Sequence, residues 1–286
     1  MKEFLKVIFS AALLLFSDCL FAQHNRSQRI FVKNPDAIYL GAFVSKSSIN
    51  ESEHIILDAP TDSLTVSSSL PILSKRFACN KLSYEKAVAD MIEAANLSNF
   101  GSVGFASTQR EFVNYADLNV LFGQEIDIES FLMTKATAPS TKTNLVFNVE
   151  HIFADFAADI KKREFDAEKL NGLEEDNIAY VSVVEYGRKA VLLVESNLGE
   201  DIVKEAINDA FEKGGIRSSK FKDVLANCTI RYISLDASTS PEELDLDPVE
   251  RFVNYLENPV TKEDFKSPMS FHLSTLNNGM YLNEYP

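Results

Sequence analysis

The stretch Asn144–His151 has the sequence Asn-Leu-Val-Phe-Asn-Val-Glu-His, in which most apolar and polar side chains alternate. Successive side chains of a strand point to opposite faces, so this alternation predicts a strand with one apolar and one polar face. The apolar face would hold Leu145, Phe147 and Val149. The polar face would hold Asn144, Asn148 and Glu150. The rest of the fold is predicted outward from this strand.

A second alternating run lies upstream, and its apolar positions are Leu118, Val120 and Phe122. The run continues through Glu125–Glu129, and a polar bend containing Pro139 separates it from the first strand. Residues Phe105–Ala154 are therefore predicted to form a long strand, a turn and a long return strand. A membrane-crossing hairpin has the same pattern, with ~9–11 residues per crossing. The predicted membrane-inserting, lipid-facing residues are Leu118, Val120, Phe122, Leu145, Phe147 and Val149.

The alternative is a half-buried strand in the sheet of an ordinary folded domain, because short alternating runs are common there. Val146 and Ile152 interrupt the polar face of the return strand, and Leu121 interrupts the upstream run. Parts of Phe105–Ala154 also fit a helix. A segment that changes from a helix to a hairpin would need apolar residues at both the helical and the strand period.

The N-terminus has the features of a secretory signal peptide. Lys2 and Lys6 precede an apolar run, Val7–Phe16, and Ala22 is a small residue before the polar Gln23. The run is too short to span a membrane, so we predict a signal peptide over residues 1–22, cleaved after Ala22. Lipid attachment at Cys19 is the alternative. The remaining region, 23–286, has about 264 residues, enough for one large domain with a real core.

The charge and the cysteine content limit the function classes. The net charge is −14, which argues against a nucleic-acid partner and against general attraction to anionic lipid. A membrane contact would therefore be apolar or would depend on a receptor. Cys79 and Cys228 lie outside the signal peptide, so one disulfide is an open question. We identify no catalytic, cofactor-binding or metal-binding motif, and predict that the protein is not an enzyme.

The remaining sequence predicts several further elements. Residues 36–71 are expected to be rich in strands, and Ile178–Val184 and Lys189–Glu195 to be buried strands. Residues 200–213 form an amphipathic helical pattern that ends at Gly214-Gly215. Further strands are predicted at Cys228–Leu235 and Pro268–Tyr281, and a further helix at Val249–Leu256.

Four segments in the same order resemble the cholesterol-dependent (thiol-activated) cytolysins. Val181–Ser196 contains a Val-Ser-x-Val-x-Tyr-Gly-Arg run followed by an apolar strand, and Val203–Phe211 resembles the helix that follows it. Phe221–Cys228 and Pro268–Leu273 resemble the segments on either side of the family's second hairpin region. Ala37–Gly41 and Ser63–Val66 are similar to early strands of the family.

The resemblance implies an α+β fold, with a twisted antiparallel central sheet flanked by helical clusters and an elongated β-rich segment from residues 36–71 and 276–286. The two clusters, at about 119–157 and 218–256, would unfold into amphipathic hairpins when many subunits close a β-barrel. Tyr186, Gly187 and Arg188 would lie in the central sheet as an assembly motif. The sequence has no Trp, and the family's C-terminal, sterol-recognising β-sandwich is expected to be absent.

The predicted function is that of a secreted pore-forming-toxin-like protein. It would assemble with itself, and would need a membrane lipid, a receptor or a longer cytolysin-like subunit to recognise its target. Cholesterol binding, a family trait, is not expected of this chain alone. The alternative is an exported, non-lytic binding or scaffold protein that retains the cytolysin core.

Overall fold

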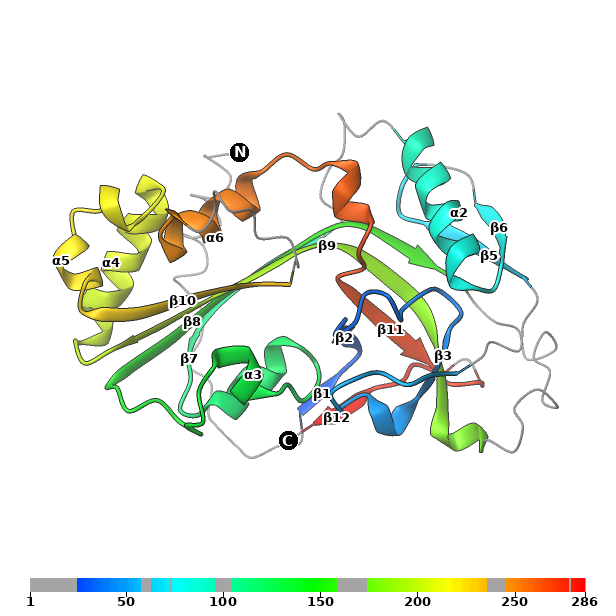
Figure 1. Ribbon diagram of the computed structural model, residues 1–286, viewed down its shortest axis with the longest axis horizontal. Coiled ribbons are helices and arrows are strands. Elements are labelled where there is room, and N and C mark those ends of the chain that lie inside the picture. Colours follow the sequence, from blue (N-terminus) through cyan, green and yellow to red (C-terminus); the bar gives the residue numbers. More distant parts are fainter. Residues whose placement is uncertain are drawn as a thin grey trace.

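A computed structural model describes residues 25–57, 63–71, 74–95, 104–158, 174–235, 245–277 and 279–285. The predicted signal peptide and Cys19 lie outside these residues. Two long antiparallel strands, β8 (Thr143–Ala157) and β9 (Ile178–Ser196), run along the length of the molecule (Figure 1). They confirm the predicted central sheet.

At one end, β8 and β9 lie between β7 (Gly104–Glu111) and β10 (Cys228–Ser234) in an antiparallel order β7-β8-β9-β10. At the other end, β9 pairs with β11 (Ser270–Ser274) and β3 (Phe43–Ser45). The sheet is completed by β2 (Arg29–Phe31), β4 (Ile56–Leu57), β5 (Ser63–Ser68) and β6 (Lys75–Ala78). A separate ribbon pairs β1 (Asn25–Ser27) with β12 (Asn283–Tyr285), near the two ends of the described chain.

The helices lie on both faces of the sheet. They are α2 (Lys81–Ala94), α3 (Ile128–Leu132), α4 (Glu200–Lys213), α5 (Lys222–Leu225) and α6 (Pro248–Glu257). Short 3₁₀ helices are η1 (Lys46–Ser48), η3 (Tyr115–Leu121), η6 (Glu175–Asn177), η7 (Ile216–Ser218) and η9 (Lys262–Phe265). Because both faces of β9 are covered, its sequence has two mostly apolar runs, 178–184 and 190–194, on either side of the charged segment Glu185–Lys189, and does not alternate.

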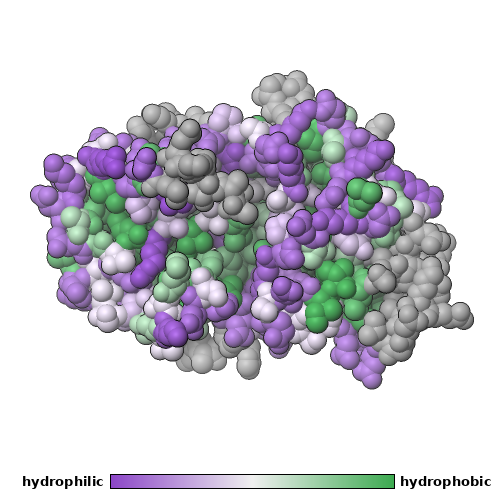
Figure 2. All heavy atoms as spheres, in the orientation of Figure 1, coloured by the Kyte–Doolittle hydropathy of each residue, from purple (hydrophilic) through white to green (hydrophobic). Residues whose placement is uncertain are grey.

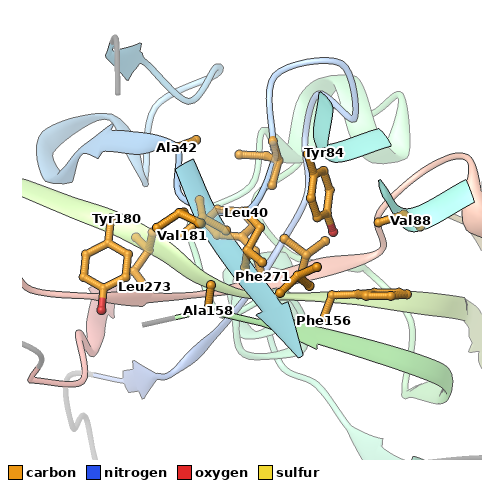
Figure 3. Close-up of a cluster of buried hydrophobic side chains, with 14 of the residues drawn as sticks. Leu40, Ala42, Tyr84, Val88, Phe156, Ala158, Tyr180, Val181, Phe271 and Leu273 are labelled. Carbon is orange, nitrogen blue, oxygen red and sulfur yellow. The ribbon is translucent and has the colours of Figure 1, made fainter. Parts of the chain in front are cut away.

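Three apolar clusters hold these layers together. The largest packs α2 and the early strands against β9 and β11 (Figure 3), with Leu40, Tyr84, Val88, Phe156, Val181 and Phe271 in its centre. A second cluster packs α4 and α6 on one face of β8 and β9. A third packs η3 and α3 on the opposite face.

Several predicted boundaries are wrong. The upstream strand is β7, and residues 117–129 are not a strand but belong to η3, a turn and α3. Within 119–157 the helical part ends at Leu132, and 218–256 contains β10 between two helices. Among the described residues of 36–71, strand is limited to β3, β4 and β5, and the last predicted strand is shortened to β11, since turns and a 3₁₀ helix occupy other described positions. Of the residues within 276–286 that the structure describes, only β12 is a strand.

Candidate functional site

Two connections of 31 residues each leave the same end of the sheet. The first connection, residues 112–142, joins β7 to β8, and the second connection, residues 197–227, joins β9 to β10. Thr143 pairs with Ser196, which in turn pairs with Cys228, so both connections begin or end at this edge. They fold back over opposite faces of the sheet (Figure 1).

The first connection is held in a helical form by its own caps. The Asp117 carboxylate accepts hydrogen bonds from the backbone N–H groups of Val113 (2.8 Å) and Asn114 (3.0 Å), which closes a capping box at the start of η3. Asp127 caps α3 by accepting from the Ser130 N–H (3.2 Å). These local bonds compete with the extended form that the alternating sequence favours.

Of the predicted lipid-facing residues in the first connection, Leu118 and Phe122 are buried against the sheet, with 0% and 2% of their surface exposed. The Phe122 ring meets the Phe31 ring edge to face, with centroids 6.0 Å apart. Val120 is 37% exposed.

Three consecutive residues, Phe122–Gln124, fasten the first connection to distant parts of the chain; we call them the clasp. The Phe31 N–H donates to the Phe122 carbonyl (3.1 Å), and the Gln124 amide donates to the Phe31 carbonyl. Asn283 Nδ2, on β12, donates to the Gly123 carbonyl (2.9 Å). Gly123 has φ +66°, and a Cβ there would lie 2.0 Å from the Arg29 carbonyl oxygen, so only glycine fits.

The other three predicted lipid-facing residues lie under the second connection. Leu145, Phe147 and Val149 are at most 2% exposed and pack against α4 and α6. The Phe147 and Phe211 rings meet edge to face at 5.5 Å. The amphipathic α4 covers this face with Val203, Ala206, Ile207, Ala210 and Phe211.

On the face under the first connection, a buried ionic network replaces part of the apolar core. The Lys189 ammonium lies 2.5 Å from Glu150 Oε1 and 2.7 Å from Asn148 Oδ1, and 4.0 Å from the centre of the Phe31 ring. Burial lowers the pKa of Lys189 to about 8, although the Glu150 carboxylate opposes this. Arg29 extends the network by donating to Glu150 (3.1 Å).

The network continues to Glu185 on β9, because Arg29 Nη2 also donates a hydrogen bond to Glu185 Oε1 at 2.9 Å. Burial alone would raise the pKa of Glu185, but His272, Arg29 and Ser270 together hold it at about 2. These charges were not identified from the sequence, because Glu185 and Lys189 lie within an apolar strand and their partners are distant in the chain.

A second set of polar contacts ties η3 to the sheet. The Tyr115 hydroxyl donates to Glu195 Oε1 (2.9 Å), and Arg231 Nη1 on β10 donates to the same oxygen (2.8 Å). Through these two hydrogen bonds, Glu195 on β9 links η3 of the first connection to β9 and β10 by polar contacts, in addition to the apolar packing.

The predicted motif Tyr186-Gly187-Arg188 lies in β9. A Cβ on Gly187 would be 2.2 Å from the His151 carbonyl oxygen, so the glycine permits a close approach of β8. The Arg188 guanidinium pairs with both Asp264 oxygens (2.8 and 3.0 Å) and donates to the carbonyls of Tyr255, Asn258 and Pro259. It therefore holds the C-terminal end of α6 against the sheet. Tyr186 is 3% exposed and contacts the Tyr84 hydroxyl.

In the part of the chain that the structure describes, no group of three or more His, Cys, Asp or Glu side chains could hold a metal ion. Cys79 and Cys228 do not form a disulfide with each other. None of the described helices is long and apolar enough to cross a membrane.

Comparison with solved structures identifies the fold. A structure of pneumolysin matches with a TM-score of 0.69 at 19% identity, over 92% of this chain and 62% of that one. A structure of listeriolysin O matches with a TM-score of 0.65 at 18% identity, over 92% of this chain and 60% of that one. Both proteins are cholesterol-dependent cytolysins.

The chain has the cytolysin fold. A further match with this fold is a structure of intermedilysin with human CD59, with a TM-score of 0.66 at 16% identity, covering 92% of this chain and 61% of that one. This chain spans about three fifths of the length of these toxins. No family model matches the sequence, and a search of curated proteins finds no match.

Proposed function

We propose that the protein acts as a pore-forming-toxin-like protein, in which the first connection opens into a β-hairpin that enters a target membrane. One observation carries the proposal: the first connection alternates at the period of a strand, yet it is folded as short helices. A segment with two compatible periods can exchange one form for the other when its surroundings change.

The length of the first connection fits a hairpin. Its 31 residues would give two arms of roughly 14 residues around a short turn, more than the ~9–11 residues that one tilted strand needs to cross the hydrocarbon core. The hairpin would extend β7 and β8 without a change of pairing.

The register of that extension decides which side chains share a face. Glu111 pairs with Leu145, so continued pairing brings Val120 opposite Ala136 and places the turn near Ile128. Cross-strand partners share a face, so all even-numbered residues would lie together. That face is mostly apolar: it holds Leu118, Val120, Phe122, Ile126, Ile128, Leu132, Ala136 and Ala138, together with the uncharged polar residues Gln124, Ser130 and Thr134. The odd-numbered face is more polar, with Asp117, Asn119, Glu125, Asp127, Glu129 and Lys135, but it also holds Leu121, Phe131 and Met133.

The same register separates the six residues predicted to face lipid. Leu118, Val120 and Phe122 continue the sheet face of Val146, whereas Leu145, Phe147 and Val149 lie on the other face. One regular hairpin cannot turn both sets to lipid. The proposal therefore keeps Leu118, Val120 and Phe122 as lipid-facing, and assigns Leu145, Phe147 and Val149 to packing against α4 and α6.

Assembly would proceed through the sheet edges. Among the described strands, β7 pairs only with β8 and β10 pairs only with β9, and a second copy would extend the sheet at these two strands. Figure 2 shows apolar side chains at the surface between the α6 and α3 layers, and the side chains of β10 are mostly half-buried. Closure of the edges must precede insertion, because unpaired backbone groups are costly in lipid.

We propose that the protein is secreted and that its signal peptide is cleaved after Ala22. We also propose that a receptor, a lipid or a longer cytolysin-like subunit brings it to the membrane. The intermedilysin structure with human CD59 supports a receptor in general terms. Cholesterol recognition by this chain alone is not part of the proposal.

A matched pair of variants tests the proposal. Val120→Lys introduces a charge on the even face at a site 37% exposed in the folded protein, and should abolish release of a dye from vesicles or cells that the wild type permeabilises. A cation near the bilayer midplane costs about 2–4 kcal/mol per subunit. Glu125→Lys, on the odd face of the same arm and exposed in the folded protein, should leave release largely unchanged. Equal release by both variants, with normal folding, would reject the hairpin.

The non-lytic alternative retains one specific observation in its favour. The second connection has the helical period of α4 throughout Glu200–Lys213 and does not alternate clearly as a strand. A protein that kept the cytolysin core for binding would show no release with any partner, and neither variant would then differ from wild type.

A further inference from the structure

His54 lies in the loop between η1 and β4, and its side chain contacts the clasp. It is 6% exposed, its Nε2 lies 3.0 Å from Gln124 Oε1, and its ring packs edge to face against Phe271 at 5.2 Å. Since the Gln124 amide nitrogen donates to the Phe31 carbonyl, the Gln124 oxygen is the acceptor and His54 Nε2 carries the proton. The imidazole thus completes a buried chain of hydrogen bonds that runs from the Phe31 carbonyl on β2, through the Gln124 amide, to His54 in the loop.

The other ring nitrogen, Nδ1, has at most a shared acceptor for a proton, the Ile49 carbonyl. His54 Nδ1 is buried and makes no hydrogen bond among the described residues. The Ile49 carbonyl beside the ring already accepts from the Lys33 ammonium, at 3.2 Å. A proton on Nδ1 would therefore place a charge in an apolar pocket beside Phe271, with a cation next to it.

The electrostatics agree with this geometry. The pKa of His54 is lowered from 6.5 to about 4, mainly by burial and in part by the Lys33 ammonium, while Gln124 and the Ile49 carbonyl oppose the shift. Lys33 is the one charged group of the described residues that acts directly on the ring. Glu51 and Glu125 act on Lys33 in turn.

We propose that His54 is a proton-operated release for the first connection: acidification charges the imidazole, drives it from its pocket and frees the clasp. The proposal rests on the proposed function, in which the first connection is the part that moves. It adds a trigger, namely exposure to an acidic medium.

The direction of the effect follows from linkage. The pKa of His54 in the closed form is lower than in an open, hydrated form, so the closed form has its full stability above pH 6.5 and loses it as the pH falls toward 4. If the open form has the ordinary pKa, the open-to-closed ratio rises roughly 30-fold between pH 7.5 and pH 5.0.

Hydrogen–deuterium exchange of the full protein, without membranes, measures the release directly. Two backbone N–H groups bond between the first connection and the rest of the chain at the clasp: Phe31 donates to the Phe122 carbonyl and Glu125 donates to Asn50 Oδ1, both at 3.1 Å, and these bonds are lost when the clasp opens. After correction for the intrinsic pH dependence of exchange, their protection should fall roughly 30-fold between pH 7.5 and pH 5.0. Protection in the centre of β9 should not change.

Two variants and one control make the test specific. His54→Gln keeps a hydrogen-bonding amide but cannot titrate, and should abolish the pH response. Lys33→Met removes the repelling ammonium and leaves the Ile49 carbonyl to Nδ1, and should reduce the response. His151→Gln removes a histidine on β8 whose pKa is also lowered by burial, and should leave the response at the clasp intact.

An unchanged response in His54→Gln, an equal loss of protection in β9, or no response in the wild type would each overturn the proposal. Vesicle leakage is measured separately. Acid opening of the clasp without leakage on any membrane would support the release and contradict the pore function, whereas leakage without acid opening would contradict the release alone.

Discussion

The Lys189 ammonium lies 2.5 Å from the Glu150 carboxylate in the middle of the sheet, beneath the first connection. The Lys189 side chain is fully buried, with the rings of Phe31 and Phe122 above it. Removing two charges from water carries a desolvation cost that their attraction only partly offsets. The first connection therefore covers a charged pair that becomes hydrated when the connection opens. Because of this hydration, opening costs less free energy than it would if the connection covered only apolar side chains.

Replacing one residue of this pair should lower the free energy of unfolding more than replacing both. Lys189→Met leaves Glu150 buried with Arg29 and Asn148 as partners, and we expect it to lower the free energy of unfolding by about 3 kcal/mol. The double variant Lys189→Met, Glu150→Leu should recover most of that loss, because no buried charge remains between the two positions. Urea denaturation of the wild type, both single variants and the double variant measures the coupling. Additive losses would show that the two residues act independently.

Arg188 and Asp264 should be coupled in the same way. Arg188→Lys cannot reproduce the two-pronged contact with Asp264 or reach all three carbonyls at the end of α6, and should cost about 2–3 kcal/mol of stability. Asp264→Asn should weaken the same contact, and the double variant should lose less than the sum. Hydrogen exchange should increase in α6 before it increases in α2. Unchanged exchange in α6 would contradict a fastening role for Arg188.

Gly187→Ala should prevent the close approach of β8 and β9. The added Cβ would meet the His151 carbonyl oxygen at 2.2 Å, and a backbone atom in the centre of a sheet has little freedom to move. We expect a loss of about 3 kcal/mol or failure to fold. Gly199→Ala is the matched control, because nothing lies within 4 Å of its added Cβ. A melting temperature for Gly187→Ala equal to that of the control would refute the crowding argument.

Phe147→Lys should damage the folded monomer rather than the inserted state. Phe147 is 1% exposed and meets Phe211 of α4, so the substitution buries an unpaired ammonium and removes an aromatic contact. We expect loss of cooperative unfolding, measured by circular dichroism before any membrane is added. Asn144→Lys, at a position only half-buried, is the control that should fold. A Phe147→Lys protein of normal stability would mean that α4 does not seal this face.

The parts of the fold that could be predicted are those with a continuous local pattern. The strand at Asn144–His151, the apolar runs of β9 and the amphipathic α4 each bury one or two faces along their whole length, so their periods are visible in the sequence. The alternation alone does not predict the helical state of the first connection, which only the family resemblance implied, because the caps at Asp117 and Asp127 and the packing on Phe31 outweigh that alternation.

The polar contacts of the candidate site were missed for a different reason. Lys189 and Glu150 are 39 residues apart, and the clasp joins Gly123 to Asn283, 160 residues away. Neither relationship exists until the strand register is known. Gln124 and His54 have no neighbouring residue of related chemistry, so nothing local distinguishes them from exposed polar residues.

The central claim is that the first connection becomes a strand whose even-numbered residues face lipid. Residues 133–138 allow a direct test, because their side chains are exposed or half-buried in the folded protein and tolerate a probe. Each is replaced in turn by cysteine in a variant lacking Cys79 and Cys228, and labelled with an environment-sensitive fluorophore. The measurement is quenching by a lipid-borne quencher on a membrane that the protein permeabilises. We predict strong quenching at 134, 136 and 138 and weak quenching at 133, 135 and 137. Quenching with a helical period, or leakage without quenching at any of the six positions, would contradict the account.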